Sequence, residues 1–319
     1  LRHELSQLLG FNHFAEKSLA TKMANTPEEV LGFLTNLANK SQTQAKVDFQ
    51  EIHDFAKQEF EQTDLQALDL TFYSEKLKQQ RYAISDEELR PYFPENKAVA
   101  GLFQVVHKLF GMNIQQREGV DVWHKDVKFY DVFDSTGQLR GSFYLDLYAR
   151  EHKRGGAWMD VCVGRTALSD GSVQLPVAYL TCNFNAPVGN KPALFTHDEL
   201  VTLFHEFGHG IHHMLTQISA SGVAGINGVP WDAVELPSQF LENWCYQPEA
   251  LAFISGHFET GEPLPQDLLD KMLAAKNFQS AMQMLRQVEF SLFDFRMHAQ
   301  YNPEKGDEIQ QVLDQVRSE

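Results

Sequence analysis

The spacing of apolar residues along the chain predicts a helical region over residues 1–110. After the cap residue Thr26 and the proline that follows it, apolar positions recur at helical spacing towards Phe60. The same spacing predicts helices over 65–80 and 97–110. We therefore expect the first third of the protein to consist of helices.

The pattern then changes, and residues 111–195 are expected to form a small β-sheet. Val, Phe and Tyr become frequent, and apolar and polar positions alternate with a period of two. Segments 127–133 and 139–147 flank a short polar, glycine-containing turn, which predicts a β-hairpin. A further strand is expected over 177–184.

Helical spacing returns in residues 196–319. Thr196 and Glu199 fit a capping box, so a helix should begin near His197 and continue to about Met214. The glycines that follow predict a mobile loop over 219–230. The next apolar pattern predicts another helix over 231–246. The fold class is thus mainly α with a small β-sheet.

Composition narrows the possible functions. The chain has 319 residues, 43% of them hydrophobic, and 43 acidic against 27 basic residues give a net charge of −16. Such a balance argues against nucleic-acid binding, because no basic stripe is present. The three cysteines are odd in number and show no CxxC spacing, so we expect free thiols: Cys162, Cys182 and Cys245. No apolar run has the length of a membrane span, so no membrane partner is expected.

The chain begins and ends inside helical patterns, at Leu1 and Glu319. We therefore expect a piece of a longer protein, from which a targeting sequence could be missing.

One motif indicates chemistry, the H-E-x-x-H sequence formed by His205, Glu206 and His209. On a helix, residues four apart project from the same face, so both imidazoles can reach one metal ion. Glu206 follows the first histidine and can act as a general base on a water molecule. The pattern predicts a zinc site that catalyses hydrolysis.

Catalytic zinc takes three protein ligands, and the third is open at this point. The extended motif with a third histidine fails, because His212 and Leu215 occupy its glycine and histidine positions. His213 could pair with His209, but no carboxylate would then follow the first ligand.

Carboxylates in the next predicted helix are the other candidates. Glu235 lies 26 residues after His209, which leaves room for a loop and a returning helix. Asp232 is better explained as an acid in the first helical turn. Glu242, seven residues after Glu235, could orient a ligand from the second coordination shell, as could Ser238, or either could form an ordinary surface or core hydrogen bond.

Several segments together resemble the thimet-oligopeptidase-like zinc metallopeptidases, and the likeness spans essentially the whole chain: LLGF, KRGGAWMD, TCNFN, HEFGH, VELPSQ, LENW and PEALAFISGHFETGEPLP. The resemblance implies one zinc ion held by His205, His209 and Glu235, with Glu206 as the base. It also implies a zincin-like, two-lobed helical fold with a deep, narrow channel that admits only short peptides, and the small sheet beside the metal.

Under this resemblance, the strand expected through Gly155, Gly156 and Ala157 could bind substrate by β-addition, although a simple glycine bend explains it equally well. The regions 1–110, 111–195 and 196–319 would then belong to one continuous catalytic domain fragment.

Members of the resembling family are much longer, and the missing C-terminal part normally supplies a tyrosine and a histidine that grip the substrate. We therefore expect a zinc-dependent endopeptidase for short oligopeptides that is weakly active in this form. A dipeptidyl carboxypeptidase and a catalytically weak peptide-binding fragment are the alternatives. The expected protein is a cytoplasmic monomer whose partners are short peptides.

Overall fold

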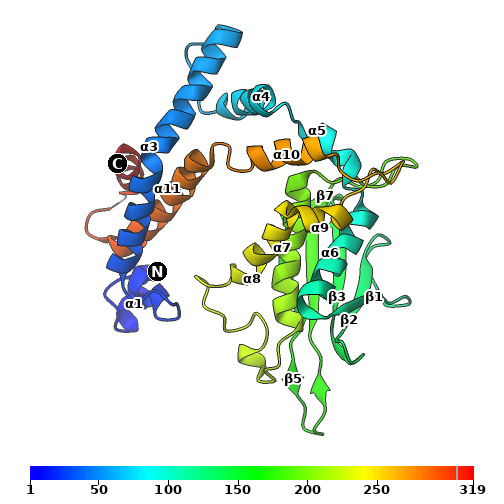
Figure 1. The fold of residues 1–319 in the computed structure, drawn as a ribbon. Coiled ribbons are helices and arrows are strands. Elements are labelled where there is room, and N and C mark those ends of the chain that lie inside the picture. The colour runs from blue at the N-terminus through cyan, green and yellow to red at the C-terminus, as the bar shows by residue number, and fades with distance from the viewer. Residues whose placement is uncertain (307) are drawn as a thin grey trace. The chain divides into compact units, whose positions relative to one another are not determined.

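A computed structural model describes residues 1–306 and 308–319 (Figure 1). The chain forms two compact units, of which the first joins Leu1–Ala83 to Ala274–Glu319 and the second is Ile84–Leu273. The three regions expected from the sequence were defined by whether their patterns predict helices or strands. The compact units group these elements differently, because the first unit takes helices from both ends of the sequence.

In the part of the first unit that the structure describes, the regular elements are all helices. Its central helix begins at Pro27 and ends at Phe60, as the sequence predicts, and the Thr26 hydroxyl caps it by accepting the Glu29 N–H at 3.2 Å. The helix predicted over 65–80 instead begins at Leu70, because the Asp69 carboxylate holds the preceding residues in a turn. The helices are α1 (Arg2–Leu8), α2 (Phe14–Leu19), α3 (Pro27–Phe60), α4 (Leu70–Tyr82), α11 (Ser280–Ala299) and α12 (Ile309–Ser318).

Two apolar clusters hold these helices together. One joins α3 to α4 through Ile52, Phe55 and Leu77, and the other joins α11 to α12 through Val288, Leu292 and Val316. Each helix buries one stripe of its surface, as amphipathic helices do.

The second unit combines helices with a sheet. Its helical elements are α5 (Asp86–Leu89), η1 (Arg90–Tyr92), α6 (Glu95–Phe110), α7 (His197–Met214), η2 (Ser221–Val223), α8 (Leu236–Glu242), η3 (Asn243–Tyr246), α9 (Pro248–Ile254) and α10 (Gln266–Ala275), whose last two residues belong to the first unit. None of the helices in the described part of the chain is both long and apolar enough to cross a bilayer.

The sheet has five strands in the order β1-β2-β3-β7-β4. The predicted hairpin is confirmed, since β2 and β3 pair antiparallel, while β3 and β7 run parallel and make the sheet mixed. A separate pair, β5 with β6, is antiparallel. The strands are β1 (Asn113–Gln116), β2 (Lys128–Phe133), β3 (Leu139–Tyr148), β4 (Trp158–Val163), β5 (Thr166–Ala167), β6 (Val173–Gln174) and β7 (Val177–Phe184).

Helix α7 packs on one face of this sheet, beside α6. The Phe207 ring meets Phe143 of β3 edge-on at 5.3 Å and lies 6.2 Å from Phe103 of α6. Gly210 of α7 leaves room for Leu180 of β7, whose side chain would lie only 2.9 Å from an added Cβ. The sheet therefore fixes the position of α7.

Two sequence expectations were wrong in detail. Gly155, Gly156 and Ala157 do not lie in a strand, because Gly156 has φ +89°, outside the extended region, and β4 begins only at Trp158. The helix expected over 231–246 begins at Leu236. Its second residue, Pro237, has no N–H to donate and is tolerated only in a first turn.

Candidate metal centre

Helix α7 carries the H-E-x-x-H motif, and its N-terminus has the predicted capping box. The Glu199 N–H donates to the Thr196 hydroxyl at 3.0 Å, and the Thr196 N–H donates to the Glu199 carboxylate at 2.8 Å. The imidazoles of His205 and His209 project from the same side of the helix, with ring centroids 5.0 Å apart.

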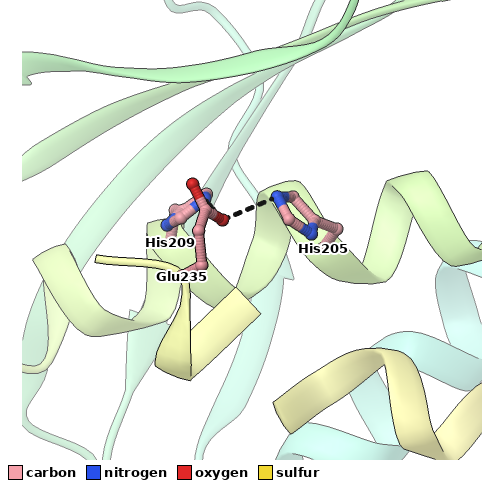
Figure 2. Close-up of side chains that lie close together, drawn as sticks. All are labelled: His205, His209 and Glu235. Atoms are coloured by element: carbon pink, nitrogen blue, oxygen red, sulfur yellow. Dashed lines mark ion pairs between the residues drawn. The ribbon is translucent and has the colours of Figure 1, made fainter. Parts of the chain in front are cut away.

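A carboxylate from the following segment lies between these two rings. Oε2 of Glu235 is 3.1 Å from Nε2 of His205 and 3.1 Å from Nε2 of His209 (Figure 2). Glu235 is the residue directly before α8, so the start of that helix sets its backbone position. Two histidines and one glutamate thus point their ligand atoms at one place, all within 4.8 Å of one another.

Two neighbouring side chains hold this arrangement. Nδ1 of His205 donates to Oε1 of Glu242 at 2.6 Å, which leaves Nε2 as the nitrogen with a free lone pair. The buried Ser238 hydroxyl donates to Oε2 of Glu235 at 2.8 Å, and therefore supports the glutamate rather than a histidine. Sequence reasoning named both residues as candidates for such support.

Close packing of α7 on α8 brings Glu235 to the histidines. A Cβ at Gly208 would lie 2.5 Å from the Pro237 carbonyl oxygen and 2.5 Å from Cα of Ser238. Any side chain at position 208 would push the two backbones apart. Position 208 is one of the variable positions of the H-E-x-x-H motif, and the close approach of α8 requires glycine there.

Glu206 lies in a buried setting suited to a base. It is 6% exposed, and burial raises the pKa of its carboxyl to about 7, an effect that His205 opposes and the Glu235 charge reinforces. The Met159 backbone N–H, from β4, faces the carboxylate and lowers its pKa, which favours the ionised form. A carboxyl that gains and loses a proton near neutral pH is suited to proton transfer.

The donor set fits a zinc ion. Two imidazole nitrogens and one carboxylate oxygen, with a fourth position open, are the ligands typical of catalytic zinc sites. Burial lowers the pKa of His209, which keeps that imidazole neutral and able to coordinate.

The other candidate ligands do not belong to this group. Among the residues that the structure describes, the group able to hold a metal contains neither Asp232 nor Glu242. His213 is fully buried, and its Nε2 lies 3.0 Å from the Val163 carbonyl oxygen at the end of β4. His212 is half-buried, and burial lowers its pKa.

Sequence reasoning missed the contributions of Met159 and Gly208. The N–H of Met159 reaches Glu206 only because the sheet places β4 beside α7, and no spacing along the chain reports this contact. The signal for Gly208 was present, since glycine inside a helix costs stability and needs a packing reason.

The model of peptidase family M3 matches residues 1–319. The chain is 64% identical over 319 residues to oligopeptidase A of Salmonella typhimurium, covering 100% of this chain and 47% of that protein. It is also 64% identical over 317 residues to oligopeptidase A of Escherichia coli, with 99% and 47% covered.

A second kind of relative is more distant. The dipeptidyl carboxypeptidase of Salmonella typhimurium is 34% identical over 299 residues, which cover 93% of this chain and 43% of that protein. The chain spans about half the length of the curated relatives it matches.

Proposed function

Because this chain belongs to peptidase family M3, we propose that it carries the metal centre of an oligopeptidase that hydrolyses internal bonds of short peptides. The observation that carries the proposal is the convergence of His205, His209 and Glu235 on one point beside Glu206. The 64% identity to proteins named oligopeptidase A supports the choice of peptide substrates. One zinc ion is the proposed cofactor.

Each residue has a role in this proposal. His205, His209 and Glu235 would hold a zinc ion, which when bound would polarise the peptide carbonyl and lower the pKa of water. Glu206 accepts the proton of the attacking water and then donates it to the leaving amine. Burial raises the pKa of Glu206 in the metal-free chain, which favours the protonated form that donates to the amine.

The proposal also covers the finer features implied by the family resemblance. We expect a two-lobed enzyme with a narrow channel, short peptides as its partners, a monomeric state and a cytoplasmic location. The substrate is expected to lie extended along β4, whose first residues follow Gly156 and Ala157.

Peptide cleavage by the zinc-loaded chain tests this function. An oligopeptidase cuts a short peptide at an internal bond even when its C-terminus is amidated, whereas a dipeptidyl carboxypeptidase requires the free carboxylate and releases dipeptides. Mass spectrometry of the products, before and after chelation and zinc restoration, separates the two activities. Binding without cleavage would favour the third reading, a catalytically weak peptide-binding fragment. Identical products with and without zinc would contradict the proposal.

The support that Glu242 gives to His205 leads to a second prediction. Glu242→Ala removes the acceptor that fixes the imidazole tautomer, and zinc affinity should fall by about 10–100-fold. Glu242→Gln keeps an acceptor oxygen at the same place and should lose less. Competition with a chelating dye measures both affinities. An unchanged zinc affinity in Glu242→Ala would show that Glu242 does not support His205 as a ligand.

A further inference from the structure

Strand β4 is an edge of the five-stranded sheet and passes directly beside Glu206. Within the described residues, its neighbour in the sheet is β7 alone. The Gly156 carbonyl oxygen accepts from Asn183 of β7, and in a trans peptide the N–H of the next residue points the opposite way, so the Ala157 N–H is directed away from β7. Backbone direction alternates along a strand, so Met159, whose N–H faces Glu206, points the same way, while the Val161 N–H is already donated to Oδ1 of Asp160 at 2.7 Å. The open edge of β4 therefore presents the backbone of Ala157 next to the metal centre.

The pairing of β4 with β7 begins at Trp158, directly after Ala157. Trp158 pairs with Thr181, and the same register would place Gly156, two residues earlier in the chain, opposite Asn183. Gly156 cannot continue the ladder, because its φ of +89° turns the backbone out of the extended conformation.

The Asn183 side chain replaces the missing ladder contact. Its Nδ2 donates to the Gly156 carbonyl oxygen at 2.6 Å and to the Arg154 carbonyl oxygen at 2.7 Å. One amide group thus uses both of its hydrogens on the connection that leads into β4. The Gly156 carbonyl is held towards β7, which leaves the following residue directed to the open edge.

The other end of the same connection is fixed by a buried lysine. The Lys153 side chain is 4% exposed, and its Nζ donates to Oδ1 of Asp146 at 2.9 Å and to the Tyr148 carbonyl oxygen at 2.8 Å. Lys153 ties the connection to β3, and Asn183 ties it to β7. Of these two contacts, the one made by Asn183 lies next to the open edge.

We propose that Asn183 is a positioning residue for peptide binding. By holding Gly156 and Arg154 it orients the backbone of Ala157 at the start of β4, so that an extended peptide can pair with this edge beside the metal centre. This inference rests on the proposed function. It adds a side chain that neither touches the metal ligands nor needs to touch the substrate.

The test compares two probes on the zinc-loaded chain, with binding as the readout instead of activity. Acetohydroxamate binds only at the metal, whereas a peptide hydroxamate of three or four residues also lies along β4. Asn183→Asp keeps the shape but removes both donors and places a carboxylate against two carbonyl oxygens. We expect peptide hydroxamate affinity to fall about tenfold or more, with acetohydroxamate and zinc affinity unchanged.

A matched control replaces another amide that donates to a backbone carbonyl. Gln62 donates to the Asp64 carbonyl oxygen at 2.7 Å in the first unit, and Gln62→Glu should leave both probe affinities at the parental value. If Asn183→Asp does not fold, Asn183→Ala removes the donors without adding charge and gives the same comparison.

Other outcomes would overturn the inference. Parental peptide affinity in the Asn183 variants would exclude a positioning role, and an equal loss for both probes would indicate general disruption of the metal centre. If the parent chain binds the peptide hydroxamate no more tightly than acetohydroxamate, β4 is not the binding edge. Failure of acetohydroxamate itself to bind would instead contradict the metal centre of the proposed function.

Discussion

Glu206→Gln should lower the rate of peptide hydrolysis by about 10²–10⁴-fold while zinc stays bound. The amide has the size of the carboxyl but cannot accept the proton of the attacking water. The metal ligands are other residues, and each keeps its own contacts. Initial rates on one short peptide, with zinc content measured on the same samples, give both quantities.

The loss of activity in Glu206→Gln should not be a loss of folding. Burial raises the pKa of Glu206 from 4.5 to about 7, so the folded state binds this proton more tightly than the unfolded state. The protonated carboxyl therefore contributes fully to the free energy of unfolding below pH 4.5, and this contribution is lost as the pH rises through about 7. The metal-free Glu206→Gln protein should therefore be more stable than the parent at pH 8, by about 1–3 kcal/mol, and equal to it at pH 4.

Urea denaturation at the two pH values measures this difference. Asp198→Asn is the matched control, since it removes an exposed carboxylate from the first turn of the same helix and should keep parental activity. A Glu206→Gln protein as active as the parent would contradict the role of this residue as the base.

Glu235→Ala should lower zinc affinity by more than about 100-fold. Loss of a residue that only orients a ligand costs 10–100-fold, and Glu235 supplies a ligand atom itself. Its side chain is half exposed, so water can enter the vacated position, and weak binding by the two histidines should remain. Competition titration with a chelator measures the change.

Asp232→Ala is the control for Glu235→Ala, because Asp232 is the nearby carboxylate outside the metal-binding group. It should keep the parental zinc affinity. Parental affinity in the Glu235→Ala protein would mean that another residue is the third ligand.

Features that depend on local sequence could be predicted. The limits of α7 followed from the capping box of Thr196 and Glu199, and the common face of His205 and His209 followed from helical spacing. The hairpin of β2 and β3 followed from alternation and a polar turn. Each of these signals lies within about twenty residues.

Features set by packing between distant segments could not be predicted. Periodicity does not reveal that helices from both ends of the chain form one unit, or that β4 lies beside Glu206. The choice among Glu235, Asp232 and Glu242 likewise depends on how closely Gly208 lets α8 approach α7. The family resemblance indicated Glu235, and the packing gives a physical reason for it.

The strand expected through Gly156 shows the limit of pattern reading. The residues after it favour strand, but the positive φ of Gly156 ends the ladder, and the Asn183 side chain makes the contact instead. A side chain that replaces a backbone hydrogen bond in this way leaves no periodic pattern in the sequence.

X-ray absorption at the zinc edge of the loaded chain tests the central claim most directly. We predict one zinc ion per chain with two imidazole nitrogens at about 2.0–2.1 Å and oxygen ligands at about 2.0–2.2 Å, from Glu235 and a water molecule. In the Glu235→Ala protein the two imidazoles should remain as ligands. Three or more imidazoles, a sulfur ligand, or no stoichiometric zinc would contradict the proposed centre.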